Sequence, residues 1–313
     1  MKSVSFLTDF YYNDLYPTLQ KLEKKRRDIK HRIIFSAIAS TAVFTALAYT
    51  LQSYYEFIIF IYIALMALLY KFMIKDYTHE FKMSVIKPLI HAIDKTMLYS
   101  SQTHVSDYFF EHSKLFEEAD KLSGNDYVKG QIDGINIQFS DIHAQNKNQD
   151  SKGKESWDTI FQGLFIVADF NKHFYGETVV LPDSAQNSFG NVIGYWLQSK
   201  NAARGELVKM DNPEFEKEFV VYSSDQIEAR YILSHSMMEK LLSFKNKSAH
   251  PIYVSFTGTH IYIAINYGKD LFEPSVFHSL LDYKVAMEYV KTLHLAIGIV
   301  EELKLNQKLW SKR

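Results

Sequence analysis

The sequence predicts an α+β protein in which an N-terminal two-helix transmembrane hairpin precedes a mainly antiparallel β cytoplasmic domain with a long C-terminal helix. Three observations predict this fold class. Residues 33–70 contain a single charged residue, Glu56. From Tyr127 onward, apolar and polar residues alternate in several short runs, which is the period of a β-strand. Within residues 281–309, apolar residues recur at helical spacing.

The apolar stretch predicts two membrane spans. Ile33 to Leu51 supplies one span, because a helix needs roughly 20 mostly apolar residues to cross the hydrocarbon. Tyr54 to Tyr70 supplies a shorter second span, which reaches Ile74 if the amine of Lys71 extends to the headgroups. Two alternatives stay open: signal-peptide cleavage after the triplet at residues 46–48, and a helical hairpin buried in a soluble core.

The basic residues around the spans predict their orientation. Lysines and arginines crowd residues 21–32 before the first span, and Lys71, Lys75 and Lys82 follow the second. The short connection at Gln52 and Ser53 carries neither residue type. By the positive-inside rule, both ends of the chain face the cytoplasm. We also expect the basic segment to attract anionic lipid.

Helical spacing continues on both sides of the spans. Residues 13–30 are expected to form a helix that runs into the first span, and residues 81–98 a second helix that Pro88 kinks or starts. The expected organisation is a cytoplasmic basic N-terminal helix at 1–32, a transmembrane hairpin at 33–75, a helical connector at 76–126 and a cytoplasmic α+β domain at 127–313.

Two β-hairpins are the clearest elements of the cytoplasmic part. Strand-like runs at 127–132 and 135–140 flank an Asp-Gly pair, a strong signal for a tight turn. Runs at 252–256 and 261–265 flank a Thr-Gly-Thr-His turn in the same way. Further strands are expected at 163–170, 177–181, 205–210 and 218–222, and helices at 223–230, 236–245 and 281–309. Fold analogy alone allows these strands to include a pleckstrin-like barrel.

The polar stretch 145–156 contains no apolar side chain and is expected to be a mobile loop inside the domain. It holds a Ser-x-x-Lys match, at Ser151 and Lys154, where no pocket is expected.

Composition removes several classes of chemistry. The chain has no cysteine, so disulfides, thiolate metal sites and cysteine nucleophiles are excluded. Its net charge of −1 does not fit a nucleic-acid-binding protein, which normally shows a basic domain or stripe. No glycine-rich phosphate loop occurs, and the 12 histidines match no common ligand spacing, so we expect neither a cofactor nor a metal.

Four residues remain as candidates for catalysis. Asp169 and His173 lie close in sequence, together with Glu177, around an expected loop and could do acid–base work. Asp225 and Arg230 flank an expected short helix. The competing interpretations are a solvated loop tip for the first group, and for the second an acid that complements the helix dipole and a surface arginine.

Four stretches of the C-terminal part carry a resemblance to a known family: 161–170 (FQGLFIVADF), 214–233 (EFEKEFVVYSSDQIEARYIL), 237–242 (MMEKLL) and 270–274 (DLFEP). In these stretches the chain resembles an uncharacterised bacterial two-pass membrane protein family that is known only as a domain of unknown function. The resemblance implies a bacterial inner (cytoplasmic) membrane location and a LemA-type membrane protein as a partner. It implies no activity.

The sequence therefore favours a membrane-anchored interaction or scaffold module, which contacts the lipid bilayer and a protein partner but no nucleic acid. Two alternatives belong to other classes. One is a membrane-tethered enzyme with a site assembled from distant residues, and the other is a domain that binds lipid headgroups.

Overall fold

The computed structural model describes residues 2–149, 153–170, 173–183 and 205–303. The chain divides into two compact units. The first, called the hairpin unit here, consists of residues 2–93 and 272–291; the second, the sheet unit, contains residues 94–271 and the chain from Thr292 onward. The architecture is α+β, with long apolar helices first, then a mainly antiparallel sheet and a C-terminal helix, as the sequence predicts.

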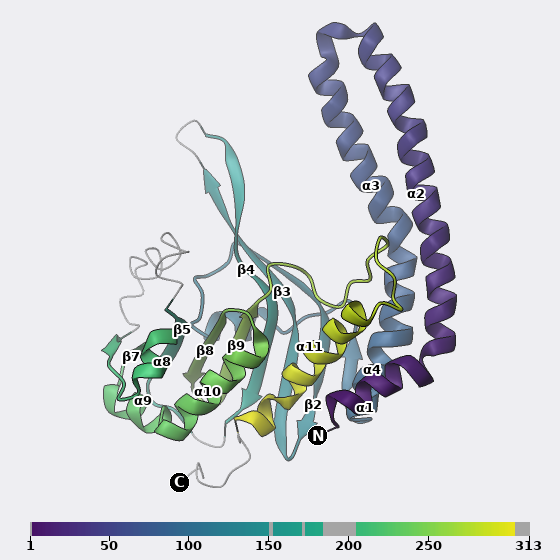
Figure 1. Ribbon diagram of the computed structural model, residues 1–313. Helices are drawn as coiled ribbons and strands as arrows, with labels where there is room; N and C mark the ends of the chain where they lie inside the picture. The colour runs from purple at the N-terminus through teal and green to yellow at the C-terminus, as the bar shows by residue number, and fades with distance from the viewer. Residues whose placement is uncertain (1, 150–152, 171–172, 184–204, 304–313) are drawn as a thin grey trace. The chain divides into compact units, whose positions relative to one another are not determined.

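Two long antiparallel helices dominate the hairpin unit (Figure 1). Across their apolar part, the hydroxyl oxygens of Thr41 and Tyr62 lie 2.6 Å apart, and Ser40 donates a hydrogen bond to the sulfur of Met66. The helical elements of this unit are α1 (Val4–Asp9), η1 (Phe10–Asp14), α2 (Tyr16–Thr50), η2 (Gln52–Tyr54), α3 (Tyr55–Phe81), η3 (Lys82–Ile86) and α4 (Lys87–Ile93).

The apolar parts of α2 and α3 are exposed. An 18-residue window of α2 has a mean hydropathy of 1.7, and one in the helical segment that contains α3 has a mean hydropathy of 2.4. Only 6% of either window is buried. Phe35, Phe60 and Phe72 expose 75%, 71% and 81% of their surface. A helix in a soluble core is mostly buried, so this exposure argues against the buried-hairpin alternative and fits lipid as the surrounding solvent. Both helices are long and apolar enough to cross a membrane.

Pro88 is preceded by a distorted helical turn. Proline has no amide hydrogen and its ring clashes with the carbonyl four residues back, so a regular α-helix cannot run through it. The chain meets this constraint with the π-helical turn η3, directly after α3, and then continues as α4. Proline-associated π-bulges of this kind let a helix go on without a break. The helix ends at Ile93, and residues 98–100 already form a strand.

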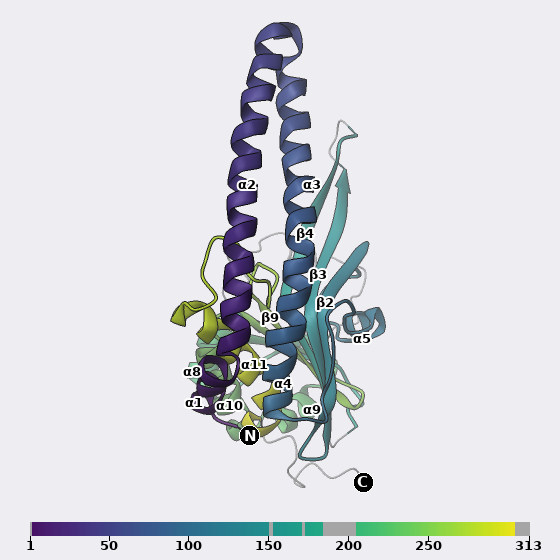
Figure 2. The same ribbon diagram turned by 90° about the vertical axis from the view of Figure 1, so that its right-hand side faces the viewer.

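One nine-stranded sheet forms the centre of the sheet unit (Figures 1 and 2). Its strand order is β1-β2-β3-β4-β9-β8-β5-β7-β6, and every neighbouring pair is antiparallel. The strands are β1 (Leu98–Ser100), β2 (Lys121–Ile132), β3 (Ile135–Gln149), β4 (Glu155–Asp169), β5 (Thr178–Pro182), β6 (Glu206–Val208), β7 (Phe219–Ser223), β8 (Ile252–Thr257) and β9 (His260–Asn266). The helices are α5 (Asp107–His112), α8 (Pro213–Glu218), α9 (Gln226–Ile232), α10 (His235–Ser248) and the later part of α11 (Tyr283–Glu302).

Both predicted β-hairpins are confirmed. In the first, Ile132 pairs with Ile135 across Asp133 and Gly134, whose φ angles are 49° and 82°. A two-residue turn with positive φ at both central positions matches the twist of the flanking strands, which is why Asp-Gly signals it so well. In the second, Thr257 pairs with His260.

Helices cover both faces of the sheet. The chain around α5 packs on one face, where Phe110 and Phe116 join strand residues such as Phe165 in one apolar cluster. In the two views, α10 lies on the opposite face (Figures 1 and 2). This explains why β5 is buried along its whole length and β8 and β9 are buried at all but their ends, although the sequence suggests one solvated face for the second hairpin.

The prediction of a mobile loop at 145–156 is largely wrong. Strand β3 runs to Gln149 and β4 begins at Glu155, so that the two form a polar ribbon beyond the apolar sheet, while residues 150–152 lie outside the described chain. Ladder hydrogen bonds need no apolar face, and Lys147 pairs with Glu155 at 2.6 Å. The strands of the described chain also form an open sheet, since no pairing joins edge strands β1 and β6 as a barrel would require.

Candidate functional site

Asp169 lies at the end of β4 and meets a histidine that the sequence did not single out as its partner. It is opposite His260 in the ladder, and Asp169 Oδ1 lies 3.5 Å from His260 Nε2. Asp169 Oδ2 accepts a hydrogen bond of 2.7 Å from the side-chain amide of Asn136. Three strands, β3, β4 and β9, therefore contribute one side chain each to this cluster.

Aromatic rings surround the imidazole of His260. The ring of Phe109 contacts it edge-on at 5.6 Å between centroids, and Tyr262 lies at 5.8 Å. Burial raises the pKa of Tyr262 to about 12, so this phenol is neutral at physiological pH. A carboxylate beside an imidazole can fix its tautomer and orientation, which is the arrangement of a proton-transfer pair. The side chains of His260 and Asp169 are 29% and 39% exposed, so water reaches the pair.

His173 belongs to a different contact. Its ring packs edge-on against Tyr175, at 5.2 Å between centroids. The loop that follows is held by Glu228, whose carboxylate accepts the backbone N–H groups of Tyr175 at 3.2 Å and Gly176 at 2.8 Å. The buried acid of α9 thus fixes the shape of this loop. His173 contacts Tyr175 whereas Asp169 contacts His260, so the two candidates belong to different clusters.

Asp225 and Arg230 sit at opposite ends of α9. Asp225 is the N-cap, and its Oδ1 accepts the backbone N–H groups of Ile227 at 2.9 Å and Glu228 at 3.0 Å. This satisfies two amides that a helix start leaves without partners. Arg230 is exposed in the last turn, where a cation complements the helix dipole.

Helix α9 also carries an exposed apolar face, called the α9 face here: Ile227 and Tyr231, one turn apart on the same side. They expose 82% and 56% of their surface, while Ala229 and Ile232 on the other side are buried. Because the side chains at positions i and i+4 of a helix lie over one another, these two form one continuous patch.

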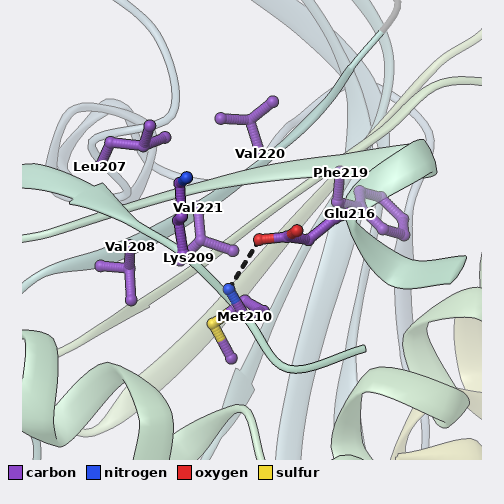
Figure 3. A pocket seen from close by; sticks show the side chains of 8 residues that line it. All are labelled: Leu207, Val208, Lys209, Met210, Glu216, Phe219, Val220 and Val221. Carbon is purple, nitrogen blue, oxygen red and sulfur yellow. Dashed lines mark hydrogen bonds between the residues drawn. The ribbon is translucent and has the colours of Figure 1, made fainter. Parts of the chain in front are cut away.

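A small pocket lies between β6, α8 and β7 (Figure 3). Its volume is about 200 Å³, below the range of roughly 300–1,000 Å³ that small-molecule sites usually have. One oxygen of Glu216 already accepts the backbone N–H of Met210 at 2.8 Å. Lys209 is the one cation among lining residues that are otherwise mostly apolar. The pocket can hold a small apolar group, and it presents no pair of groups suited to proton transfer.

No group of three or more histidines, aspartates or glutamates within the described ranges has the geometry to hold a metal ion.

A second polar cluster, in the hairpin unit, was not anticipated from the sequence. Glu23 and Arg26 on α2 are only 4% and 7% exposed. The Arg26 guanidinium donates to both oxygens of Glu23, at 2.9 Å from Nε and 2.7 Å from Nη2. Its Nη1 donates to the carbonyl of Val276 at 2.5 Å, and the backbone N–H of Leu280 donates to Glu23 at 3.3 Å.

Two further contacts complete this cluster. Lys82, at the start of η3, forms an ion pair with Glu273 although its own side chain is only 4% exposed. Tyr11 donates its hydroxyl to the carbonyl of Leu280 at 2.8 Å. Together these contacts fasten residues 272–282, called the connecting segment here, to α2 and η3.

Glu23 and Arg26 each stabilise the charged form of the other. Burial opposes ionisation of Glu23, but the hydrogen bonds and charge of Arg26 outweigh it, so the pKa of Glu23 lies below its ordinary value. The hydrogen bond to Glu23 likewise raises the pKa of Arg26. The nearby hydroxyl of Tyr77 is buried and has no hydrogen-bond partner within the described part of the chain, and burial raises the pKa of this phenol.

A sequence signal for this cluster did exist. Leu19, Leu22, Ile29 and Ile33 mark a buried stripe at helical spacing, and Glu23 and Arg26 fall on or beside it. A charged pair three residues apart on an apolar stripe predicts a buried ion pair rather than a lipid-facing cation. Seven basic residues between positions 21 and 32 hide this pair, because the run as a whole has the composition of a membrane-flanking segment.

Comparisons with known proteins match part of the chain. No curated protein matches the chain. Among solved structures, the crystal structure of the mycobacterial trehalose monomycolate transport factor A, TtfA, aligns over 64% of this chain and 86% of that chain, with 10% identity and a TM-score of 0.36. That score is too low to carry over a property. Residues 159–305 match a family described as a protein of unknown function (DUF3137), in agreement with the resemblance to a domain of unknown function that the sequence shows.

Proposed function

We propose that the protein is a membrane-anchored interaction module that holds its sheet unit at the cytoplasmic face of a bacterial inner membrane. The exposure of α2 and α3 is the observation that carries this proposal. Each helix presents an apolar window of which 6% is buried, and in water such a surface would drive aggregation. A bilayer removes that cost.

The charges at the two ends of the hairpin support the orientation. Lysines and arginines lie at the end of the hairpin where α2 begins and α3 ends, and none lies in the connection at Gln52 and Ser53. The positive-inside rule then leaves that connection on the outer side of the membrane and the rest of the chain in the cytoplasm.

The α9 face supports an interaction role for the sheet unit. Ile227 and Tyr231 lie on a helix whose start is capped by Asp225 and whose buried side holds Glu228 in place. A rigid, exposed apolar pair with an aromatic member is the kind of surface that contributes most to protein interfaces. The occupant we propose is an apolar surface of a second protein in the same membrane. A LemA-type membrane protein is the first to test, on the family resemblance alone.

The anchoring is tested by labelling single cysteines with a membrane-impermeant maleimide in intact cells. The chain has no cysteine, so each introduced thiol is the only one. Ser53→Cys should label from outside, whereas Tyr175→Cys should label only after the membrane is opened. Release of the protein by alkaline carbonate, or labelling of both sites from the same side, would contradict the proposal.

The interaction is tested by placing a photo-crosslinking amino acid at Tyr231 in native membranes. A discrete crosslinked protein should form there and be lost when Ile227→Asp removes the apolar neighbour. The matched control is the same probe at Leu98, which is 70% exposed on β1. Absence of a product at 231, or the same product from both positions, would count against the α9 face as a docking surface.

One observation favours a second candidate, a membrane-tethered enzyme. Asp169 and His260 form a carboxylate–imidazole pair that two strands bring together, as acid–base catalysis requires. Hydrolysis or group transfer by the purified full-length protein should then be lost in His260→Ala and kept in His235→Ala, an exposed histidine of α10. Activity that survives both substitutions would exclude this pair as its source.

A further inference from the structure

The connecting segment is held at a fixed height on the hairpin. Arg26 binds the carbonyl of Val276, Glu23 accepts the N–H of Leu280, and Tyr11 donates to the carbonyl of Leu280. Glu273 is tied to Lys82 near the other end of the segment. These contacts come from three separate helical elements, so residues 273–280 cannot slide along α2 without breaking buried hydrogen bonds.

That height lies next to the expected membrane surface. Arg26 precedes Ile33, where the apolar span begins, by seven residues. At 1.5 Å per residue, the carbonyl that Arg26 binds lies about 10 Å below the hydrocarbon boundary. The headgroup layer on each side of a bilayer is roughly 5–8 Å thick. The connecting segment rises alongside the two long helices (Figures 1 and 2).

Phe277 follows Val276 directly and is 52% exposed, although its neighbours on both sides of the segment are anchored. An aromatic ring held at this level can enter the interfacial region without crossing the bilayer. Its backbone N–H is bound by Ser275 Oγ at 3.1 Å, and the same hydroxyl accepts from the N–H of His278 at 3.2 Å. The turn that presents the ring is therefore defined.

Five exposed cations surround this level of the hairpin, and we call them the cationic collar: Lys24, Arg27, Arg32, Lys71 and Lys75. Two exposed acids, Asp28 and Asp76, lie among them, so cations prevail. Arg26 is absent from the collar because Glu23 and Val276 occupy its donors inside the protein. Counted along α2 from Ile33, the collar cations lie from about 2 Å below the hydrocarbon boundary at Arg32 to about 14 Å below it at Lys24, a range that includes the headgroup layer.

We propose that Phe277 and the cationic collar form an interfacial lipid contact that prefers anionic phospholipid headgroups. This inference rests on the membrane anchoring proposed above. The collar binds the phosphodiester and headgroup anions, while the ring of Phe277 inserts between headgroups. The buried pair Glu23–Arg26 takes no part in lipid binding and instead positions the segment that carries the ring.

The experiment uses spin labels on single cysteines in the full chain, reconstituted into vesicles. One set contains phosphatidylcholine alone and the other contains phosphatidylglycerol as well. Phe277→Cys is the test position, Phe60→Cys in the apolar part of α3 is the reference for hydrocarbon, and Tyr16→Cys at the start of α2 is the aqueous reference in the same unit. Collision rates are measured with oxygen, which enters lipid, and with a water-soluble nickel chelate.

In anionic vesicles, the collision rates of the label at 277 should lie between those of the two reference labels. Its collision rate with nickel should be at least about twofold lower than that of the label at 16. The protection of the label at 277 from nickel should weaken in pure phosphatidylcholine and when Arg32, Lys71 and Lys75 are changed together to glutamine, since attraction of basic groups to the surface is electrostatic. Arg27 is left unchanged in this variant because it also pairs with Glu23, at 3.4 Å.

Two results would overturn the inference while leaving the anchoring intact. In the first, the label at 60 is embedded but the label at 277 collides with nickel as often as the label at 16. In the second, protection at 277 is the same with and without phosphatidylglycerol and in the glutamine variant, which would remove the preference for anionic headgroups. A label at 60 that is open to nickel would instead refute the anchoring itself.

Discussion

At the scale of single residues, the buried pair Glu23–Arg26 is the contact whose loss should cost most in the hairpin unit. Glu23→Ala removes both carboxylate oxygens to which the buried Arg26 guanidinium donates and leaves it the carbonyl of Val276. Removing one member of a buried ion pair costs about 3 kcal/mol or more, because the other charge stays desolvated. Thermal unfolding in detergent should show this loss of stability.

The control for that substitution is Glu80→Ala, which breaks the ion pair with Lys25 at 2.6 Å. The two side chains are 48% and 38% exposed. An exposed pair contributes at most about 1 kcal/mol, since water already solvates both charges. Equal effects of the two glutamate substitutions would mean that burial of the first pair contributes nothing.

The same pair predicts a dependence of stability on pH. The pKa of Glu23 in the folded protein lies below its ordinary value of 4.5. A carboxylate with a lowered folded pKa stabilises the fold at pH values above its unfolded pKa, and this stabilisation disappears as the pH falls through the folded pKa. The stability difference between the wild-type protein and Glu23→Gln should therefore be full at pH 7 and shrink below about pH 4.5. Unfolding midpoints of the two proteins across this range provide the measurement, and a constant difference would contradict the assignment.

At the scale of elements, a glycine in β4 sets how closely two strands approach. Gly163 has a φ of 155°, and a Cβ atom there would lie 2.2 Å from the carbonyl oxygen of Ile265 on β9. That oxygen is backbone in the middle of the sheet and cannot move aside cheaply. Gly163→Ala should therefore destabilise the sheet unit by about 2 kcal/mol or more.

Gly258→Ala is the matched control, because it lies in the turn between β8 and β9 with a φ of 61° and nothing within 4 Å of an added Cβ. It should cost only the backbone strain of a left-handed residue, about 1 kcal/mol. Chemical denaturation of both variants gives the comparison. If the two costs are equal, steric contact with β9 is not what requires glycine at position 163.

Local signals account for the elements that were predicted correctly. The Asp133-Gly134 turn and the β8–β9 hairpin depend on residues within about 15 positions of each other, and their registers follow from the turns. The ribbon at the ends of β3 and β4 was missed because hydrophobic alternation is the sequence signal for a strand, and strands solvated on both faces do not show it.

The candidate sites depend on contacts that no local pattern encodes. Asp169 lies 91 positions from His260 in the chain, and only the pairing of β4 with β9 brings them together. Arg26 lies 250 positions from Val276. The family resemblance did include the stretch that contains Glu273, but without a structure nothing connected that stretch to the base of the hairpin.

At the scale of the whole molecule, the division into two units predicts how the protein unfolds. Each unit has a buried core of its own, around Tyr11 and Phe81 in one and around Phe165 in the other. Proteins with separate cores need not unfold in one cooperative step. Scanning calorimetry of the full chain in detergent should show two transitions.

The substitutions argued above assign those transitions. Glu23→Ala should lower only the transition of the hairpin unit, and Gly163→Ala only that of the sheet unit. In the double variant the two shifts should add, because distant residues without a shared partner act independently to within about 0.5 kcal/mol. A single transition that both substitutions lower would show instead that α11, whose residues belong partly to one unit and partly to the other, couples the two cores into one cooperative structure.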